Sequence, residues 1–292
     1  MTTLVCLGLG YSAEHFVKGF GEKFGRIVGT VRSAERAAAL NAQSAGRLEA
    51  VVFDGKTAPA ELRDAIVGAD AALISIPQDA AGDPVLRLFG AAFETAPRLR
   101  AIVYLSTVGV YGDCNGAWVD EDTAAKPTSA RSRERLAAEG EWQALGARRG
   151  IAVAVLRLAG IYGPGRSALT QVQRGDARRV VKPGQVFNRI HVGDIAQTID
   201  AAIARRASGR FNVADDEPTP PGEPIAFAAQ LLGVPPPPEI PFAQAAPAMS
   251  ELALSFWQEC RRVKNDKLKR DLGVRLHYPT YREGLRALFA EQ

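Results

Sequence analysis

The chain has 292 residues, of which 47% are hydrophobic and 23% are charged, with 36 Lys and Arg against 32 Asp and Glu. These proportions are typical of a folded globular protein and exclude disordered, collagen-like and disulfide-scaffold chains. The formal net charge of +4 is spread along the chain, whereas nucleic-acid-binding proteins usually gather basic residues into a stripe. No apolar run approaches the about 20 residues that cross a bilayer. We therefore expect neither a nucleic acid nor a membrane as a partner.

The three cysteines, Cys6, Cys114 and Cys260, lie far apart and form no CxxC pair. This spacing favours a reducing compartment and argues against a structural zinc site. No two histidines or acids have the spacing of metal ligands, and the first residues lack the basic region and cleavage site of a signal peptide. The sequence thus predicts a cytoplasmic protein without a bound metal.

Short apolar runs alternate with segments of helical spacing along the first half of the chain. The runs are residues 4–7, 27–31, 51–53, 71–76, 102–105 and 152–158. Between the first two, apolar residues at positions 13, 16, 17, 20 and 24 follow one face of a helix. Continuous apolar strands alternating with helices indicate a parallel sheet covered on both faces. The sequence predicts an α/β, doubly wound (Rossmann) fold.

The pattern changes after residue 160. Prolines and glycines crowd between residues 163 and 184, and four consecutive prolines occupy positions 235–238. Residues 194–204 nevertheless indicate a helix, and residues 211–213 indicate a strand. We expect a Rossmann domain in residues 1–160, to which residues 188–213 return, and a smaller mixed α/β region in residues 161–292.

A glycine-rich turn follows the first apolar run and opens the first predicted helix. It consists of Gly8, Leu9, Gly10, Tyr11, Ser12 and Ala13, a GxGxxA pattern. Gly8 permits a tight turn, Gly10 lets the backbone approach a pyrophosphate, and Ala13 is small enough for the helix to pack on the strand. The helix N-terminus adds an anion site. In this position the turn predicts a dinucleotide site that includes Tyr11 and Ser12, rather than a plain strand end.

Residues at the ends of the next runs bear on which dinucleotide is bound. NAD-preferring folds carry an acid about 20 residues after the turn, but here the second run ends without one, at Arg32. Arg32 stands where a 2′-phosphate would lie, which favours NADP over NAD; the alternative is a surface arginine. Asp54 follows the third run, and Ser75 and Pro77 end the fourth. We expect all three to line the cofactor groove, although ordinary turn chemistry also explains them.

Several later sequence motifs match those of one protein family. They are Tyr-Leu-Ser-Thr-Val-Gly-Val-Tyr-Gly at 104–112, Arg-Leu-Ala-Gly-Ile-Tyr-Gly-Pro-Gly at 157–165, Ile-His-Val-Gly-Asp-Ile-Ala at 190–196, Arg-Val-Lys-Asn at 262–265 and Tyr-Pro-Thr-Tyr-Arg-Glu-Gly-Leu at 278–285. In this order they resemble the extended short-chain dehydrogenase/reductases, the NAD(P)-dependent epimerase/dehydratase group, over nearly the whole chain. The resemblance implies a Rossmann domain and a small C-terminal substrate domain, with the active site in the cleft between them.

The resemblance breaks down at the catalytic positions. The family combines a Ser or Thr at the end of the fifth strand with a Tyr-x-x-x-Lys pair on the next helix. Thr107 matches the first position, but Arg131 stands at the tyrosine and Arg135 at the lysine. An arginine stays protonated and cannot shuttle a proton as a phenol does, whereas Arg135 could still bind ribose or phosphate. With GxGxxA in place of the usual GxxGxxG, the chain looks most like the atypical branch of the family.

Other residues are expected to face the cleft, each with a structural alternative. Tyr111 and Tyr162 are the phenols near the motif ends, so one of them could replace the missing acid, although packing is the commoner role of such tyrosines. The further candidates are Asp113, Glu121 in an acidic loop, His191, and Arg166 and Arg189, which could bind an anionic substrate. A solvated loop, a structural histidine and chance placement of arginines are the respective alternatives.

Two functions of different class follow. In the first, the protein is an NADP-dependent oxidoreductase, epimerase or dehydratase acting on a small polar substrate, such as a nucleotide sugar or another anionic compound. In the second, it is a dinucleotide-binding sensor or scaffold without turnover. Arg131 at the proton-donor position favours the second function, and the retained Thr107 with a cleft-forming C-terminal region favours the first. The sequence leaves the substrate and the oligomeric state open.

Overall fold

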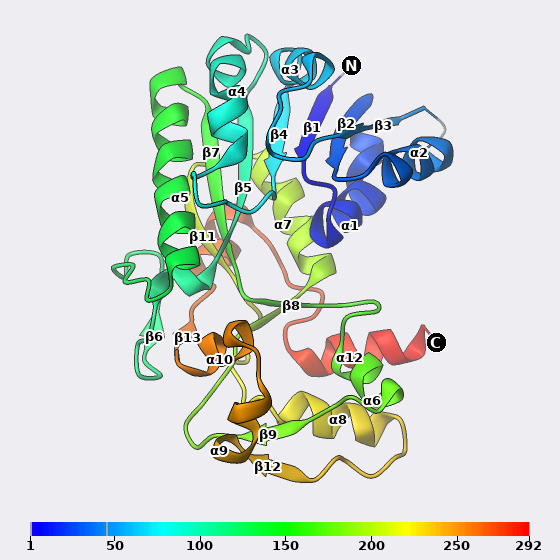
Figure 1. Ribbon diagram of the computed structural model, residues 1–292, viewed down its shortest axis with the longest axis vertical. Coiled ribbons are helices and arrows are strands. Elements are labelled where there is room, and N and C mark those ends of the chain that lie inside the picture. The colour runs from blue at the N-terminus through cyan, green and yellow to red at the C-terminus, as the bar shows by residue number, and fades with distance from the viewer. Residues whose placement is uncertain (1, 45, 292) are drawn as a thin grey trace.

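The computed structural model describes residues 2–44 and 46–291 and is built on one seven-stranded sheet (Figure 1). Its strands are β1 (Thr3–Leu7), β2 (Arg26–Val31), β3 (Leu48–Val52), β4 (Ala71–Ile74), β5 (Ala101–Thr107), β7 (Ala152–Leu158) and β11 (Gly209–Val213). They lie in the order β11-β7-β5-β4-β1-β2-β3, and every neighbouring pair is parallel. The doubly wound parallel sheet predicted from the sequence is thus confirmed.

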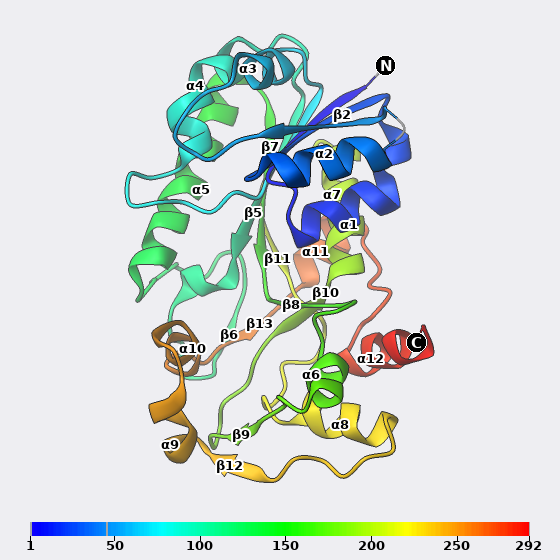
Figure 2. The same cartoon turned by 45° about the vertical axis from the view of Figure 1, so that its right-hand side comes forward.

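Helices cover both faces of this sheet (Figures 1 and 2). One face carries α1 (Tyr11–Phe20), α2 (Ala34–Gln43), α7 (Val192–Ala204) and α11 (Asp266–Leu272), and the other carries α3 (Ala60–Val67), α4 (Pro84–Thr95) and α5 (Ala130–Arg149). Successive side chains of a strand point to opposite faces, so Leu4 and Cys6 of β1 pack into the first layer and Val5 and Leu7 into the second. This double burial explains why the strands are continuous apolar runs.

The strand order places a crevice beside β1. The chain moves outward from β1 to β2 and β3, then crosses back to β4 on the other side of β1. Doubly wound sheets bind ligands outside the carboxyl ends of their strands, where the order reverses in this way. The turn after β1 therefore lies at the point of the fold where a ligand is expected.

The remaining elements form a smaller lobe, which lies beyond the carboxyl edge of the sheet (Figures 1 and 2). Its helices are α6 (Ala168–Arg174), α8 (Glu223–Leu231), α9 (Phe242–Ala245), α10 (Glu251–Trp257) and α12 (Tyr281–Ala290). Its strands form three short parallel pairs, β8 (Gly160–Tyr162) with β10 (Arg189–His191), β9 (Arg179–Val181) with β12 (Glu239–Pro241), and β6 (Trp118–Val119) with β13 (Arg262–Val263). The chain thus passes between the sheet domain and the smaller lobe more than once, both before and after β11.

A buried ion pair links α5 to β5 and β7 near the carboxyl ends of these strands. Arg157 and Glu139 are both 1% exposed, and their closest nitrogen and oxygen are 2.7 Å apart. Ser106, which is paired with Arg157 in the sheet register, donates its hydroxyl to Glu139 at 2.5 Å. The Arg157 guanidinium also lies 4.8 Å from the centre of the Tyr111 ring. Removing one partner of such a pair would leave an uncompensated buried charge, so these contacts fix the ends of β5 and β7 relative to α5.

Within the described residues, no helix is long and apolar enough to cross a membrane.

Candidate functional site

The glycine-rich turn is held by the two strands beside β1. Gly8 has a φ of +104°, a conformation that favours glycine. Its N–H donates to Thr30 Oγ1 at 2.7 Å, and its carbonyl accepts the Ser75 hydroxyl at 2.6 Å. A Cβ on Gly8 would lie 2.6 Å from Ser75 Oγ. The sequence correctly placed a tight turn here, but it did not reveal that Thr30 and Ser75 hold it.

The start of α1 is open. Gly10 is the N-cap residue and supplies no side-chain cap, so the amides of Tyr11, Ser12 and Ala13 begin the helix without an intrahelical partner. A Cβ on Gly10 would meet no atom within 4 Å. Ala13 is 1% exposed and packs into the core beneath the turn. Free amides, the positive end of the helix dipole and open space together form a cradle that fits a phosphate group.

The ends of β2 and β3 present one free cation and one acid. Arg32 is exposed, and none of the described carboxylates pairs with it, whereas Arg36 is paired with Glu14 of α1 at 2.6 Å. Asp54 accepts the backbone amides of Lys56 and Thr57, and these bonds hold the pKa of its carboxyl below the usual value. Both side chains lie at the carboxyl edge of the sheet, beside the open turn.

The loop after β4 borders the same crevice. Ser75 is half-buried because it supports Gly8, and Pro77 is exposed. Gln78, which the sequence analysis did not single out, donates to the Tyr104 hydroxyl at 2.5 Å. Burial raises the pKa of Tyr104, and the neighbouring Arg135 only partly offsets this effect. The Tyr104 phenol is therefore a neutral hydrogen-bonding group.

Two hydroxyls lie beside Gly109, just after the end of β5. Thr107 is the last residue of the strand, and its Oγ1 accepts the Gly109 amide at 3.1 Å. A Cβ on Gly109 would lie 3.2 Å from Ser132 Oγ and 3.4 Å from Thr107 Oγ1, so both hydroxyls border one glycine. Ser132 also accepts a hydrogen bond from Ser129 at 3.0 Å. The sequence analysis missed Ser132, although its place next to Arg131 was a usable signal.

The two arginines on α5 lie one turn apart on the same helix face. Arg135 is 9% exposed and donates to the Leu105 carbonyl at 2.9 Å and to Tyr104 at 3.3 Å. Its guanidinium is therefore anchored at the carboxyl end of β5. Arg131 is exposed, lies in the first turn of α5 and makes no polar contact with another described residue. Its charge is available to an incoming anion.

Both candidate phenols are engaged inside the protein. Tyr111 is 1% exposed and donates its hydroxyl to Asn212 Oδ1 at 2.7 Å. Tyr162 is 8% exposed and donates to the Thr280 carbonyl at 3.4 Å. Burial raises the pKa of both phenols. Both hydroxyls are thus already used in hydrogen bonds within the protein.

The other candidates hold loops in place. Asp113 accepts the amides of Asn115 and Cys260, and the buried Glu121 accepts the Asn212 amide at 2.8 Å. Arg189 donates to the Phe187 carbonyl at 3.1 Å, and burial lowers its pKa. No three His, Cys, Asp or Glu side chains in the described part of the chain are arranged to hold a metal ion.

His191 and Asp194 join the sheet to the smaller lobe. The Asp194 carboxylate accepts the backbone amides of His277 and Tyr278 at 2.7 and 3.1 Å, which ties the segment before α12 to α7. His191 caps α7 by accepting the Gly193 amide on Nδ1, so its hydrogen sits on Nε2, which is buried and has no hydrogen-bond partner among the described residues. This burial lowers the pKa of His191 to about 4. The residue is a structural cap.

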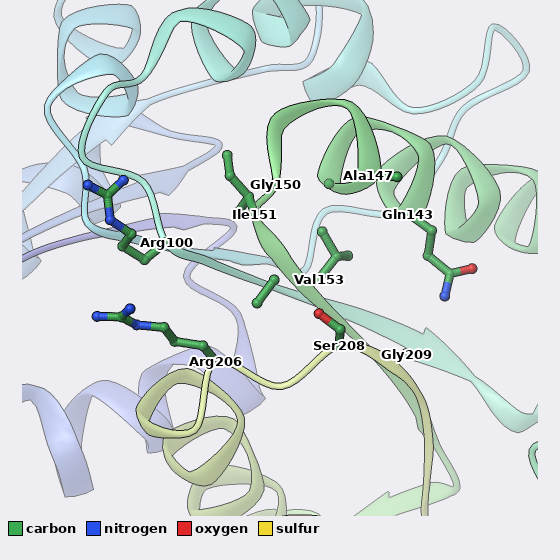
Figure 3. Close-up of a pocket in the computed structure, with 11 residues that line it drawn as sticks. Arg100, Gln143, Ala147, Gly150, Ile151, Val153, Arg206, Ser208 and Gly209 are labelled. Carbon is green, nitrogen blue, oxygen red and sulfur yellow. The ribbon is translucent and has the colours of Figure 1, made fainter.

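A hollow of about 560 Å³ lies at the opposite, amino edge of the sheet (Figure 3). Arg100, Ile151 and Ser208, which directly precede β5, β7 and β11, line it together with Arg206. None of the site residues predicted from the sequence borders this hollow. The candidate site is therefore the carboxyl edge, where the glycine-rich turn, Arg32, Thr107 and Arg135 lie at the ends of neighbouring strands or beside them.

Comparisons with known proteins agree with this geometry. The family model described as the NAD dependent epimerase/dehydratase family matches residues 68–214, half of the chain. The chain belongs to this family. The resemblance inferred from the sequence motifs is thus confirmed.

The proteins that resemble this chain match different shares of its length. A 3-diazoavenalumate denitrifying reductase from Streptomyces sp is 29% identical over 174 residues, which are 57% of this chain and about half (54%) of that protein. The structure of a functionally unknown conserved protein from Silicibacter pomeroyi DSS is 44% identical with a TM-score of 0.87, and covers 100% of this chain and 99% of that one. A dTDP-glucose 4,6-dehydratase from Bacillus anthracis str. Ames, in complex with NAD, has a TM-score of 0.76 at 16% identity, over 99% and 96% of the two chains, and shares the fold.

The low pKa of His191 predicts acid sensitivity of the folded state. Because the folded-state pKa of about 4 lies below the usual 6.5, only the unfolded chain binds this proton as the pH falls from 6.5 to 4, and the stability due to this residue is lost in that window. His191→Asn keeps an N-cap acceptor without the titration. Between pH 7.5 and 4.5 the parent should lose about 2–3 kcal/mol more unfolding free energy than this variant in urea titrations. Equal losses in the parent and His191→Asn would contradict the assignment.

Proposed function

We propose that the protein binds a nicotinamide dinucleotide across the carboxyl edge of its sheet, with the diphosphate at the start of α1. The observation that carries this proposal is the turn itself, in which Gly8 is held by Thr30 and Ser75 while Gly10 leaves uncapped amides facing open space. Anions bind at such helix starts because amide N–H groups and the helix dipole both favour negative charge. Membership of an NAD-dependent family supports the choice of ligand.

We further propose that the cofactor is NADP, with NAD as the alternative. Arg32 is the exposed cation at the end of β2, and its charge is not used by an ion pair with another described residue. A planar guanidinium can grip phosphate oxygens through two parallel bonds. Asp54, Ser75 and Pro77 would border the adenosine half of the ligand, and the anchored Arg135 would lie nearer its nicotinamide half. A cytoplasmic location stays a prediction from the sequence.

The chemistry we propose is that of an NADP-dependent oxidoreductase, epimerase or dehydratase. A bound nicotinamide supplies or accepts a hydride. The hydroxyls of Thr107 and Ser132 can hydrogen-bond a substrate carbonyl or hydroxyl, and the exposed Arg131 would attract an anionic group on the substrate. A small anionic polar compound, such as a nucleotide sugar, fits this arrangement. The reductase and dehydratase names of two proteins that resemble the chain are in keeping with this class.

Arg131 on α5 and the two buried tyrosines support a second candidate function. Arg131 cannot cycle a proton, and Tyr111 and Tyr162 are both buried and engaged within the protein. These observations favour a dinucleotide-binding sensor or scaffold without turnover. Steady oxidation or reduction of the nicotinamide with a panel of nucleotide sugars, aldehydes and ketones, followed by absorbance, would eliminate this second function.

The turn provides the first test of the proposed function. Gly10→Val should fold normally, because a Cβ at this position meets no atom within 4 Å, but its side chain should fill the cradle and abolish dinucleotide binding in calorimetric titrations. Gly19→Val is the matched control, since Gly19 lies on the same helix and its Cβ would also meet no atom within 4 Å. A folded Gly10→Val protein with unchanged affinity for NADPH and NADH would refute the assignment.

The preference for NADP provides the second test. A hydrogen bond to a charged group contributes roughly 1.5–3 kcal/mol, so Arg32→Ala should weaken NADPH binding by about tenfold or more and leave NADH binding nearly unchanged. The exposed Arg63→Ala on α3 is the control. Equal losses for both dinucleotides would mean that Arg32 contacts a group that they share, and an NADH preference in the parent would overturn the choice of NADP.

A further inference from the structure

The turn between β8 and α6 contacts the start of α1. The Tyr11 hydroxyl donates to the Pro164 carbonyl at 3.0 Å. Gly163 and Arg166 close this turn by exchanging two backbone hydrogen bonds of 3.0 Å. A Cβ on Gly163 would lie 2.6 Å from both Tyr11 Oη and Val192 Cγ1, so a glycine is what allows this close approach. The turn is therefore packed directly against the first residue of the helix that carries the open cradle.

This contact brings a free cation to the same place. The Arg166 guanidinium lies 5.8 Å from the centre of the Tyr11 ring. Burial raises the pKa of Tyr11, and the nearby charge of Arg166 partly offsets this rise. Arg166 is exposed, and no carboxylate in residues 2–44 or 46–291 pairs with it. By contrast, Arg36, which also lies beside α1, is already neutralised by Glu14.

The β8–α6 turn thus brings a cationic side chain close to Tyr11, the first residue of α1. The uncapped amides of Tyr11, Ser12 and Ala13 carry the positive end of the α1 dipole. Arg166 approaches this end from the smaller lobe, and a cation there is unfavourable unless a negative group accompanies it. The arrangement therefore fits a ligand whose negative charge lies between the helix start and the β8–α6 turn.

We propose that Arg166 is a second cationic residue for the diphosphate of the dinucleotide, acting from the smaller lobe opposite the α1 amides. This inference rests on the proposed function and adds to it a residue outside the strand–turn–helix unit. It also separates the roles of two arginines. Arg32 is assigned to the phosphate that only NADP carries, whereas Arg166 is assigned to the diphosphate that NAD and NADP share.

The test is a calorimetric titration of NADH and NADPH into the parent protein, Arg166→Ala, Arg166→Lys and Arg174→Ala. Arg174 is the matched control, because it is exposed in the last turn of α6, the helix that follows the Arg166 turn. We expect Arg166→Ala to weaken the binding of NADH and NADPH by the same factor, about tenfold, and to reduce the dependence of affinity on salt. Arg166→Lys should lose less, because it keeps the charge, and Arg174→Ala should match the parent.

The other outcomes separate this inference from the function on which it rests. If the parent binds neither dinucleotide, the proposed function itself is wrong. If the parent binds both and Arg166→Ala behaves like Arg174→Ala, the role of Arg166 is overturned while the dinucleotide site stands. A loss confined to NADPH would also overturn it, because Arg166 would then contact the 2′-phosphate. Because Arg166 is exposed, we expect its variants to unfold at the same temperature as the parent. Measuring this temperature separates a loss of affinity from misfolding.

Discussion

The common direction of the seven strands is the constraint on which the rest of this structure depends. Because all of them are parallel, their carboxyl ends share one edge, and residues from distant parts of the chain collect there. Thr107, Leu158 and Val213 are in register across β5, β7 and β11, so the loops that follow these three strands begin at the same edge. The buried pair of Arg157 and Glu139 fixes these strand ends relative to α5. The smaller lobe is attached at this edge, where Asp194 holds the segment before α12.

The candidate site at this edge combines an open helix start with two arginines on α5. The turn at Gly8 and Gly10 retains the open helix start of a dinucleotide fold, and Thr107 retains its place at the end of β5. On α5, the exposed Arg131 and the anchored Arg135 place two permanent cations one helical turn apart. Together with the uncapped amides of α1, these cations make the carboxyl edge of the sheet favourable for negatively charged groups.

Much of the fold could be predicted from the sequence, because apolar runs and helical spacing report burial directly. The one helix traced in detail shows where such patterns mislead. The apolar spacing predicted that the first helix extends to Phe24, whereas α1 ends at Phe20 and a 3₁₀ turn follows. Phe24 kept the pattern because it packs on Phe16, with ring centres 6.2 Å apart, from outside the helix. Burial alone therefore extended the predicted element beyond its hydrogen-bonded end.

The candidate site was less accessible to sequence reasoning. Spacing identifies which residues follow a strand, so Gly8, Arg32 and Thr107 could be placed at the cleft. Spacing does not indicate which side chains point into the protein. The Tyr111 hydroxyl, for example, donates a hydrogen bond to Asn212, which is 101 residues away in the sequence. The contact between Tyr11 and Pro164 spans 153 residues and depends on how the two parts of the molecule pack. Such long-range contacts leave no local pattern.

The central claim, that the carboxyl edge binds a nicotinamide dinucleotide at the start of α1, is tested most directly by a crystal structure of the protein grown with NADPH. The account predicts the diphosphate on the amides of Tyr11, Ser12 and Ala13, with the 2′-phosphate beside Arg32. Density for the dinucleotide elsewhere, for example in the hollow lined by Arg100 and Arg206, would contradict it. So would a cleft that stays empty at saturating NADPH.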